Sequence, residues 1–591
     1  MDFLKTYLSS CLGALTALIA FFFLSIVFVS ILIGGLMSVS EDKVILEENS
    51  VLHLKLDAQI NEMQQENPLA GLPIPGGEVQ KIGLLQLKQA IANAKDDDKI
   101  RGIYLEVSQP MAGFSSIEEI RESLIDFKEN GKWIVAYNEV MSEGAYYLSS
   151  VADEIYLNPQ GEVEFNGLTI NIGFYKKLFD KLEIKPQIFR VGEFKSAVEP
   201  FLMEKMSAEN RLQLTELANG IYDYMLTRIA ESRDIEKARL EEISDKMLVR
   251  NAPAAVELGL VDSLLYRDQF IEVLKNKLEI DDDDDIKFVK YNRYRKSFST
   301  YKSSKNEIAV IVADGTIMPG DGNQNDQVIG ADKFVEEIRK ARTDDDIKAI
   351  VLRVNSPGGE FKASDMMWRE ITLASEAKPV IGSMGDYAAS GGYYLAMACD
   401  TIVAMPHTIT GSIGIFGIMF DMSDFLGDKL GITFDEVRTG DFGDTYTVTR
   451  PLTEAEKNFI QRNLNEYYET FTSKAAEGRD VAHEEIQKVA SGRVWTGAQA
   501  LDRNLVDVLG GFNDAVKIAA EKAGVEDDYK VRFYPTPKNF LEELMSSLEE
   551  NAEAGTIKAR LGELYPWYQQ VRKIQQYQGA QARMPFELHF H

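Results

Sequence analysis

Two side chains of this sequence could together hydrolyse an acyl bond without a classical triad. Ser390 lies in DYAASGGYYLAMACD (386–400), where an apolar run gives way to a helical pattern. A helix N-terminus there would favour developing negative charge. Lys195 lies in VGEFKSAVEPF (191–201), and a buried lysine can serve as a base because desolvation lowers its pKa. The alternatives are an N-cap serine and a solvated surface lysine.

Histidine offers no clear alternative base for this serine. A classical triad needs a histidine positioned by a carboxylate. The five histidines are His53, His407, His483, His589 and His591. His407 alone lies close to Ser390 in sequence, and no His-Asp pairing emerges.

An internal repeat covers most of the chain. DKIRGIYLEVSQP (98–110) matches DDIKAIVLRVNSP (345–357) at an offset of 247 residues. GAYYLSSVADEIYLNP (144–159) matches GGYYLAMACDTIVAMP (391–406) at the same offset. A constant offset over about sixty residues indicates two homologous halves in tandem.

The two copies have lost complementary residues. Glu143 stands where the second copy has Ser390, and Gly443 stands where the first copy has Lys195. One half therefore keeps the serine and the other keeps the lysine. We predict that the two halves share a single site.

A glycine turn follows the same division. NSPGGE (355–360) follows an apolar run, so the backbone N–H groups of Gly358 and Gly359 could bind an oxyanion at a strand end. The first copy has Met111 and Ala112 at these positions. An ordinary Pro-Gly turn is the alternative reading, but the first copy keeps the proline without the glycines.

Short apolar runs alternate with helical patterns in each half, which predicts parallel βαβ units and an α/β fold. In the second half we expect strands at IAVIVADG, IKAIVLRVN, VIGSMG and TIVAMP, with helices at ADKFVEEIRKAR, KASDMMWREITLASEA and GGYYLAMA.

The first apolar run, residues 11–37, contains no charged residue and is 27 residues long, enough to cross a bilayer and too long for a signal peptide. We expect an uncleaved transmembrane anchor with the bulk of the chain outside the cytoplasm. The net charge of −29 argues against a nucleic-acid partner. An intrachain disulfide between Cys11 and Cys399 is not expected, because Cys11 lies in the apolar run.

The predicted organisation has six segments. They are a cytoplasmic N-terminus (1–10), the anchor (11–37), a first repeat with the lysine (45–280), a linker (281–305), a second repeat with the serine (306–535) and a helical C-terminal tail (536–591).

Several motifs resemble one known family over nearly the whole chain after the anchor. NSPGG, YAASGGYYLA, TGSIGIFG, FRVGEFKSAVEPF and GRVWTGAQALDRNLVDVLGG are similar to the long, tandem-repeat form of bacterial signal peptide peptidase A. The resemblance implies two Clp protease/crotonase-like repeats and a serine endopeptidase with a Ser-Lys dyad. It also implies signal peptides as substrates, and no metal or nucleotide cofactor.

The resemblance assigns roles to individual residues. Ser390 would be the nucleophile and Lys195 the general base. The oxyanion donors would be the N–H of Gly359 with that of Gly358 or Gly391, and Ser412 would hold the lysine. We further expect the bacterial inner membrane, a periplasmic catalytic part and a homo-oligomer, by resemblance a tetramer.

Two alternatives stay open at this point. The chain could be a non-catalytic membrane scaffold built on a protease-like fold. An acyl-CoA enzyme of the crotonase type would also fit the sheet pattern, but not an extracytoplasmic location. Residues alone leave undecided whether Lys195 meets Ser390 within one chain or between subunits.

Overall fold

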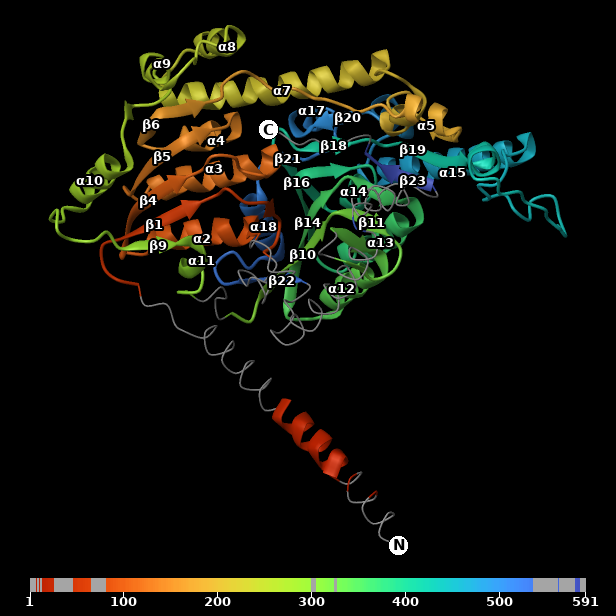
Figure 1. Cartoon of the computed structure of the whole chain (residues 1–591), viewed down its shortest axis with the longest axis horizontal. Coiled ribbons are helices and arrows are strands. Elements are labelled where there is room, and N and C mark those ends of the chain that lie inside the picture. The colour runs from red at the N-terminus through yellow and green to blue at the C-terminus, as the bar shows by residue number, and fades with distance from the viewer. Residues whose placement is uncertain are drawn as a thin grey trace.

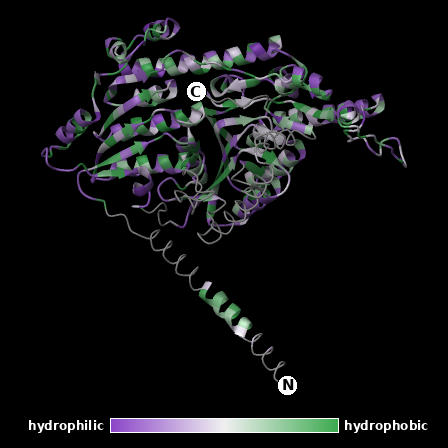
Figure 2. Cartoon of the chain, in the orientation of Figure 1, coloured by the Kyte–Doolittle hydropathy of each residue, from purple (hydrophilic) through white to green (hydrophobic). Residues whose placement is uncertain are grey.

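A computed structural model describes residues 7, 10, 13–25, 46–64, 81–298, 304–323, 327–534, 562 and 580–584. Residues 13–25 form a helix whose side chains are mostly apolar and exposed, and it is largely green in Figure 2. Within the described ranges, none of the helices reaches the combination of length and hydropathy required of a membrane span. The remainder of the predicted span 11–37 lies outside the described residues.

The first repeat is built on a parallel six-stranded sheet in the order β8-β6-β5-β4-β1-β9. The apolar runs of the sequence become its central strands, because a sheet covered by helices on both faces buries nearly every side chain. The strands are β1 (Ser50–Lys55), β4 (Ile100–Glu106), β5 (Trp133–Met141), β6 (Glu154–Val163), β8 (Ser263–Leu264) and β9 (Phe288–Lys290).

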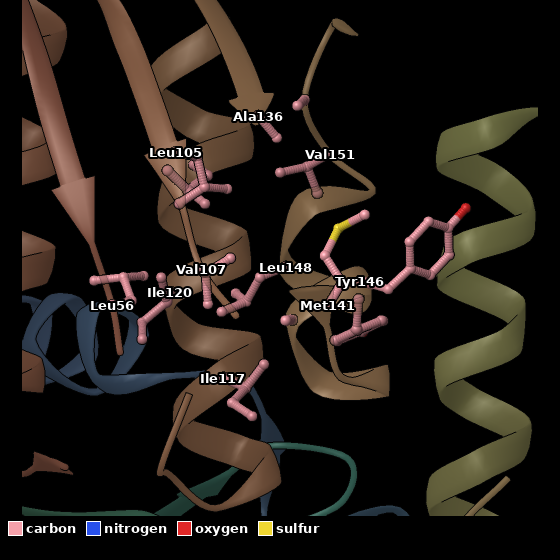
Figure 3. Packing of buried hydrophobic residues seen from close by; sticks show 14 of the residues in the cluster. Leu56, Leu105, Val107, Ile117, Ile120, Ala136, Met141, Tyr146, Leu148 and Val151 are labelled. Carbon is pink, nitrogen blue, oxygen red and sulfur yellow. The ribbon is translucent and has the colours of Figure 1, made fainter. Parts of the chain in front are cut away.

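Helices cover both faces of this sheet (Figure 1). They are α2 (Leu84–Asp96), α3 (Phe114–Lys128), α4 (Glu143–Ser149), α8 (Lys237–Asp245), α9 (Ala252–Glu257), α10 (Arg267–Leu278) and α11 (Tyr291–Tyr294). Figure 3 shows side chains of β4, β5, α3 and α4 filling the core, with Tyr146 extending toward the long helix α7 (Ala208–Arg233). A short parallel pair, β2 (Ile60–Asn61) and β3 (Ile82–Gly83), lies beside it.

The second repeat has the same architecture. Its main sheet runs β20-β18-β16-β14-β10-β22, with β17 and β21 attached at β16. The strands are β10 (Glu307–Asp314), β14 (Ile347–Ser356), β16 (Val380–Ala389), β17 (Thr401–Ala404), β18 (Ile409–Gly411), β20 (Val494–Thr496), β21 (Val508–Leu509) and β22 (Lys530–Tyr534). The packed helices are α12 (Ala331–Thr343), α13 (Phe361–Ser375), α14 (Gly391–Ala396), α16 (His483–Val489), α17 (Gly497–Leu501) and α18 (Phe512–Ala523). The strands and helices predicted for this half, and its α/β class, are confirmed.

A third sheet joins the two repeats, in the order β12-β13-β11-β15-β23-β19-β7. Its strands are β7 (Lys185–Val191), β11 (Thr316–Met318), β12 (Gly322–Asn323), β13 (Val328–Gly330), β15 (Gly358–Glu360), β19 (Ile415–Asp421) and β23 (Ala580–Arg583). The first repeat contributes β7, which pairs antiparallel with β19 along all seven residues. This pairing places the residues that follow β7 beside the second repeat.

Two long helices reinforce the same junction. In Figure 1, α7 runs along the top of the molecule from the first repeat to β20 of the second. Its counterpart α15 (Glu454–Gly478) packs on β7 and β19. The remaining helical segments between these elements are short. They are α5 (Lys176–Leu182), η1 (Ser196–Val198), α6 (Glu199–Leu202) and the π-helical turn η2 (Phe425–Lys429).

A buried ion cluster also ties the repeats together. The guanidinium of Arg353, on β14, bonds both carboxylate oxygens of Glu62 at 2.8 and 3.0 Å and lies 2.7 Å from Glu119. Both carboxylates belong to the first repeat. All three side chains are almost completely buried, so the charges of Arg353 and Glu62 depend on each other across the junction, whereas Glu119 is also bonded to Lys88 of its own repeat.

Two predicted segment boundaries are corrected by the structure. The predicted linker 281–305 contains β9 and α11, whose Val289, Tyr291 and Tyr294 are buried in the first repeat's core, because β9 continues the sheet beside β1. Most of the predicted helical tail 536–591 lies outside the described residues. Its described stretch 580–583 is a strand, held between β15 and β19.

Candidate active site

Ser390 lies at the turn between the end of β16 and the start of α14, as expected from the apolar run before it and the helical pattern after it. Its backbone has φ 55° and ψ −111°, outside the helical region. Its N–H donates to the carbonyl of Gly411 at 2.8 Å, and the residue is completely buried. This strained backbone, which a non-glycine residue adopts only when its surroundings impose it, fixes the direction of the hydroxyl.

The N-cap explanation for Ser390 is wrong. Among the described residues, its side chain makes no capping hydrogen bond to α14. The equivalent helix of the first repeat, α4, is capped by Ser142, whose hydroxyl accepts from the N–H of Ala145 at 3.3 Å. The hydroxyl of Ser390 is therefore directed elsewhere than into its own helix.

Lys195 follows β7 and is carried to Ser390 by the strand pairing between β7 and β19. The N–H of Phe194 donates to the carbonyl of Ser491 at 2.9 Å, which anchors this segment to the second repeat. The side-chain nitrogen Nζ of Lys195 lies 2.8 Å from Ser390 Oγ within one chain. The two residues are 195 positions apart in sequence.

Lys195 is not a solvated surface lysine, because none of its surface is exposed. Burial lowers the pKa of its side chain well below the ordinary value of 10.5. Removal from water disfavours the charged form, so the structure favours an uncharged amine beside the serine hydroxyl.

The contacts of Nζ match the valence of an uncharged amine, which has two N–H donors and one lone pair. Besides Ser390 Oγ, Nζ lies 2.9 Å from the carbonyl oxygen of Ser412 and 3.0 Å from Ser412 Oγ. The carbonyl can only accept, and Ser412 Oγ has a long contact of 3.5 Å to which it can donate, the carbonyl of Gly492. With both N–H groups donated to Ser412, the lone pair faces Ser390.

The glycine turn lies directly beside Ser390. Gly358 has φ +98°, and a Cβ there would lie 2.6 Å from the backbone nitrogen of Gly391. A Cβ on Gly391 would in turn lie 3.1 Å from Gly358 Cα. The N–H of Gly358 already donates to Ser356 Oγ at 3.1 Å. Of the three glycines predicted as oxyanion donors, Gly358 therefore has its N–H engaged within the turn.

In the first repeat, the positions that correspond to Ser390 and to the glycine turn have other residues with other contacts. Glu143 is buried, and its carboxylate accepts from the N–H of Gly167 at 3.0 Å. Burial raises the pKa of Glu143 to about 7. Met111 is 54% exposed, and its carbonyl accepts from Ile60 at 3.0 Å. The first repeat supplies the lysine, while its own copy of the turn has become structural.

His407 is not directed at the serine. Its ring packs edge-on against Phe114, with centroids 4.6 Å apart, and lies 4.9 Å from the ring of Tyr224. Burial lowers the pKa of His407 to about 4. These contacts make it an interior residue at the junction of the repeats.

One residue that positions the lysine was missed by sequence reasoning. A Cβ on Gly492 would lie 2.6 Å from Lys195 Cβ and 2.7 Å from Lys195 N, so glycine is needed for this close approach. Gly492 opens the motif GRVWTGAQALDRNLVDVLGG, and an internal glycine next to an arginine carries no signal of such a contact on its own.

The comparison with known proteins matches one family model to two separate parts of the chain, one in each repeat. Residues 126–281 and 372–526, more than half of the chain together, match the family model described as "Peptidase family S49". Residues 302–410 match the one described as "Clp protease".

Full-length relatives are similar along most of the chain. "Serine protease SPPA, chloroplastic" of Arabidopsis thaliana is 32% identical over 88% of this chain and 76% of that protein. "Protease 4" of Haemophilus influenzae is 33% identical over 91% of this chain and 90% of that protein. "Protease 4" of Salmonella typhi is 36% identical over 82% and 78%, respectively.

Proposed function

The chain belongs to peptidase family S49 and is a serine protease, and we propose that it is a membrane-anchored endopeptidase that degrades cleaved signal peptides through Ser390 and Lys195. The family indicated by the sequence motifs is thereby confirmed. The catalytic pair, the substrate class and the anchor are our proposal.

One observation carries the catalytic proposal. Nζ of a fully buried Lys195 lies 2.8 Å from Oγ of a fully buried Ser390, within hydrogen-bond reach of the proton that a base must remove. The nearby Ser412 accepts both remaining hydrogen bonds of the amine. Burying a lysine costs free energy, and an apolar side chain would fill the same space without that cost. A purely structural role therefore does not account for a lysine at this position.

The mechanism follows from this arrangement. Ser390 Oγ attacks the substrate carbonyl while its proton passes to the lone pair of Lys195. The resulting ammonium is held by Ser412 and then protonates the leaving amine. Water hydrolyses the acyl-enzyme, and Lys195 acts as the base a second time. This scheme uses neither a metal nor a nucleotide.

We assign the oxyanion donors to the N–H groups of Gly359 and Gly391. Gly358 is the less suitable donor because its N–H is given to Ser356 Oγ. Gly391 follows the nucleophile directly, and its N–H begins α14, where the unpaired N–H groups of a helix favour a negative charge. Two donors that need no rearrangement stabilise the tetrahedral intermediate more than the substrate.

The substrate class and location rest on the sequence of the N-terminus and on the family. The charge-free run 11–37 has the length of a membrane anchor. An anchored protease with a strand-binding site would meet the apolar cores of signal peptides where these are left, at the periplasmic face of the bacterial inner membrane. A homo-oligomer, by family a tetramer, belongs to the same proposal.

A serine-directed acylating probe tests the catalytic proposal against the non-catalytic scaffold. We expect the probe to label Ser390, as located by peptide mass spectrometry, and to label neither Ser390→Ala nor Lys195→Ala at a comparable rate. Lys362→Ala is the control for loss of a lysine, because Lys362 is an exposed lysine of the second repeat, which carries Ser390. A folded Lys195→Ala protein that is labelled as fast as wild type would exclude lysine as the base.

A further inference from the structure

The segment that carries Lys195 contacts a buried amide on the long helix α7. Gln213 is 2% exposed, and its side-chain nitrogen Nε2 lies 3.2 Å from the carbonyl oxygen of Phe194 and 2.9 Å from Ser196 Oγ. Phe194 and Ser196 flank Lys195 in the chain. The Gln213 amide therefore donates to both neighbours of the lysine.

The same amide also contacts the second repeat. Gln213 Oε1 accepts from the N–H of Val494, on β20, at 3.3 Å. Strand β20 pairs with β18, and beside this pair the N–H of Ser412 donates to the carbonyl of Arg493 at 2.7 Å. Ser412 is the residue that accepts both hydrogen bonds of the lysine amine. The side chain of Gln213 thus joins the segment of the base to the strand that holds Ser412.

Gln213 is part of a buried network of polar side chains within the first repeat. Asn210 Oδ1 accepts from Ser196 Oγ at 2.9 Å and lies 3.1 Å from Gln213 Nε2. Asn210 Nδ2 donates to Glu199 Oε2 at 2.9 Å, and the hydroxyl of Ser207 donates to Glu199 Oε1 at 2.5 Å. Buried polar groups whose hydrogen bonds are satisfied hold one another in a single arrangement. The position of Gln213 is therefore fixed by contacts other than those to the lysine side chain.

Helix α15 is the counterpart of α7 in the second repeat. Both helices begin after a hydroxyl N-cap, Ser207 and Thr453, and these two residues are 246 positions apart. At the ends of the helices, ESRD (231–234) matches EGRD (477–480) at the same offset. The two helices can therefore be compared position by position.

The amides occur only in the repeat that keeps the lysine. At the offset of 246, Glu456 stands where α7 has Asn210, and Phe459 stands where it has Gln213. Phe459 is 36% exposed and lies beside Phe442, with ring centroids 6.0 Å apart. The fold that both repeats share does not require an amide at either position. The presence of the amides follows the lysine and not the shared fold.

We propose that Gln213 is a positioning residue for Lys195, which holds the main chain on both sides of the lysine against β20 and so keeps Nζ directed at Ser390. This inference rests on the proposed function, because it concerns the base of that reaction. Among the described residues, Nζ is contacted by Ser390 and Ser412 and not by Gln213. Gln213 acts through the backbone, which must be fixed because the lysine side chain itself is long and flexible.

Two properties of the base depend on this positioning. The distance from Nζ to Ser390 Oγ decides how readily the proton is transferred. The burial of Lys195 keeps the amine uncharged, because removal from water lowers its pKa well below 10.5. A segment released from α7 and β20 would admit water to the lysine, raise its pKa and lengthen its distance to the serine.

The pH dependence of hydrolysis of a synthetic signal peptide by full-length Gln213→Met tests the proposal. Methionine is similar in size to glutamine but cannot form these hydrogen bonds. We expect kcat to fall by about 10- to 100-fold with KM unchanged, because the residue acts on the base and not on the substrate. Activity rises with pH as the lysine loses its proton. The midpoint of this rise should move up by at least about 0.5 pH unit, because a more hydrated lysine has a higher pKa.

Gln499→Met is the matched control, because Gln499 Oε1 accepts from a backbone N–H of the same strand β20, that of Thr496, at 3.1 Å. It should keep the kcat and the pH midpoint of the wild type. A Gln213→Met protein that is less stable but has the wild-type kcat and midpoint per folded molecule would overturn the proposal. If Gln213→Met does not fold, Ser196→Ala, which removes one acceptor of the Gln213 amide, should raise the midpoint in the same direction, and an unchanged midpoint would contradict the positioning role.

Labelling of Ser390 by the acylating probe separates failure of this proposal from failure of the proposed function. If the wild type is labelled and hydrolyses the peptide, while Gln213→Met behaves as the wild type at every pH, the positioning role is wrong and the catalytic pair stands. If the wild type is neither labelled at Ser390 nor able to hydrolyse the peptide, the catalytic proposal itself fails, and the role of Gln213 fails with it.

Discussion

At the scale of single residues, the buried lysine is the most consequential feature of the site. Among the described residues, Nζ of Lys195 has three hydrogen-bond contacts: the hydroxyl of Ser390 and the hydroxyl and carbonyl oxygens of Ser412. None of these three oxygens carries a charge. Its uncharged state therefore comes from burial rather than from a neighbouring cation. In the proposed mechanism, catalysis and stability therefore depend on the same property of this side chain.

Replacing Lys195 by methionine should change the pH dependence of stability. Between the lowered pKa of the native lysine and pH 10.5, the unfolded chain binds a proton that the native lysine does not bind. The free energy of unfolding of the wild type should therefore rise with pH in this range, by up to about 1.4 kcal/mol per pH unit, relative to Lys195→Met. Urea unfolding at about pH 7 and pH 9 measures this difference. Lys362→Met should show no such trend.

The comparison of the two repeats with each other was informative at this scale, because a residue present in only one repeat is not required by the fold that both share. The exchange of Ser390 for Glu143, and of Lys195 for Gly443, singled out two residues that the structure places 2.8 Å apart. The role of Ser412 was assigned only through the family resemblance and stays a prediction, and Gly492 was missed. The contacts of both residues with the lysine follow from the docking of the repeats, which no local pattern encodes.

At the scale of elements, the turn between β14 and β15 allows the site to hold an extended chain. Gly358 needs its glycine for two separate reasons. Its φ of +98° is strained for any other residue, and a Cβ would overlap the carbonyl of Ala582. The same clash would meet any peptide bound in that register.

Gly358→Ala should lower the rate of peptide hydrolysis by about 100-fold or more in a chain that still folds. Gly131→Ala is the matched control, because Gly131 has φ +73° but open space around its Cα. Both changes should lower stability by at least about 1 kcal/mol through the left-handed backbone, whereas only the first should affect catalysis. Thermal unfolding and the rate of peptide cleavage measure the two effects, and equal losses of activity would contradict the assigned role of the turn.

The predicted elements were those whose packing is local to one repeat. Alternating apolar runs identified the strands of the second repeat, since each run is buried between helices of the same repeat. Strand β23 was missed because its Ala-Gln-Ala-Arg sequence has little preference for a strand. It is extended because β15 and β19 offer backbone groups on both sides, a tertiary effect that outweighs local propensity.

At the scale of the whole molecule, activity depends on how firmly the two repeats dock. The ion cluster of Arg353 with Glu62 and Glu119 crosses their junction, as does the pairing of β7 with β19. The positions of Lys195 and Ser390 relative to each other are set by these contacts, because the two residues belong to different repeats.

Arg353→Met should lower the free energy of unfolding by about 3–5 kcal/mol, because the buried carboxylate of Glu62 would lose its cationic partner, although Glu119 would keep Lys88. It should also reduce peptide hydrolysis beyond the loss of folded protein. Arg342→Met is the control within one repeat, where Glu370 keeps its bond of 2.9 Å to Arg339, and should cost about 1 kcal/mol. Denaturant unfolding with activity per folded molecule distinguishes the two variants. An equally small effect of Arg353→Met would contradict a docking role.

The division of the proposed catalytic pair between two repeats also has a consequence for the order of events during synthesis. Ribosomes make proteins from the N-terminus, so the lysine leaves the ribosome long before the serine, which is 195 residues further along the chain. A nascent chain that has only its first half has a base but no nucleophile. Such a chain cannot hydrolyse peptides by this mechanism while its synthesis is still under way. Competence begins only when the second half has been synthesised and has folded against the first.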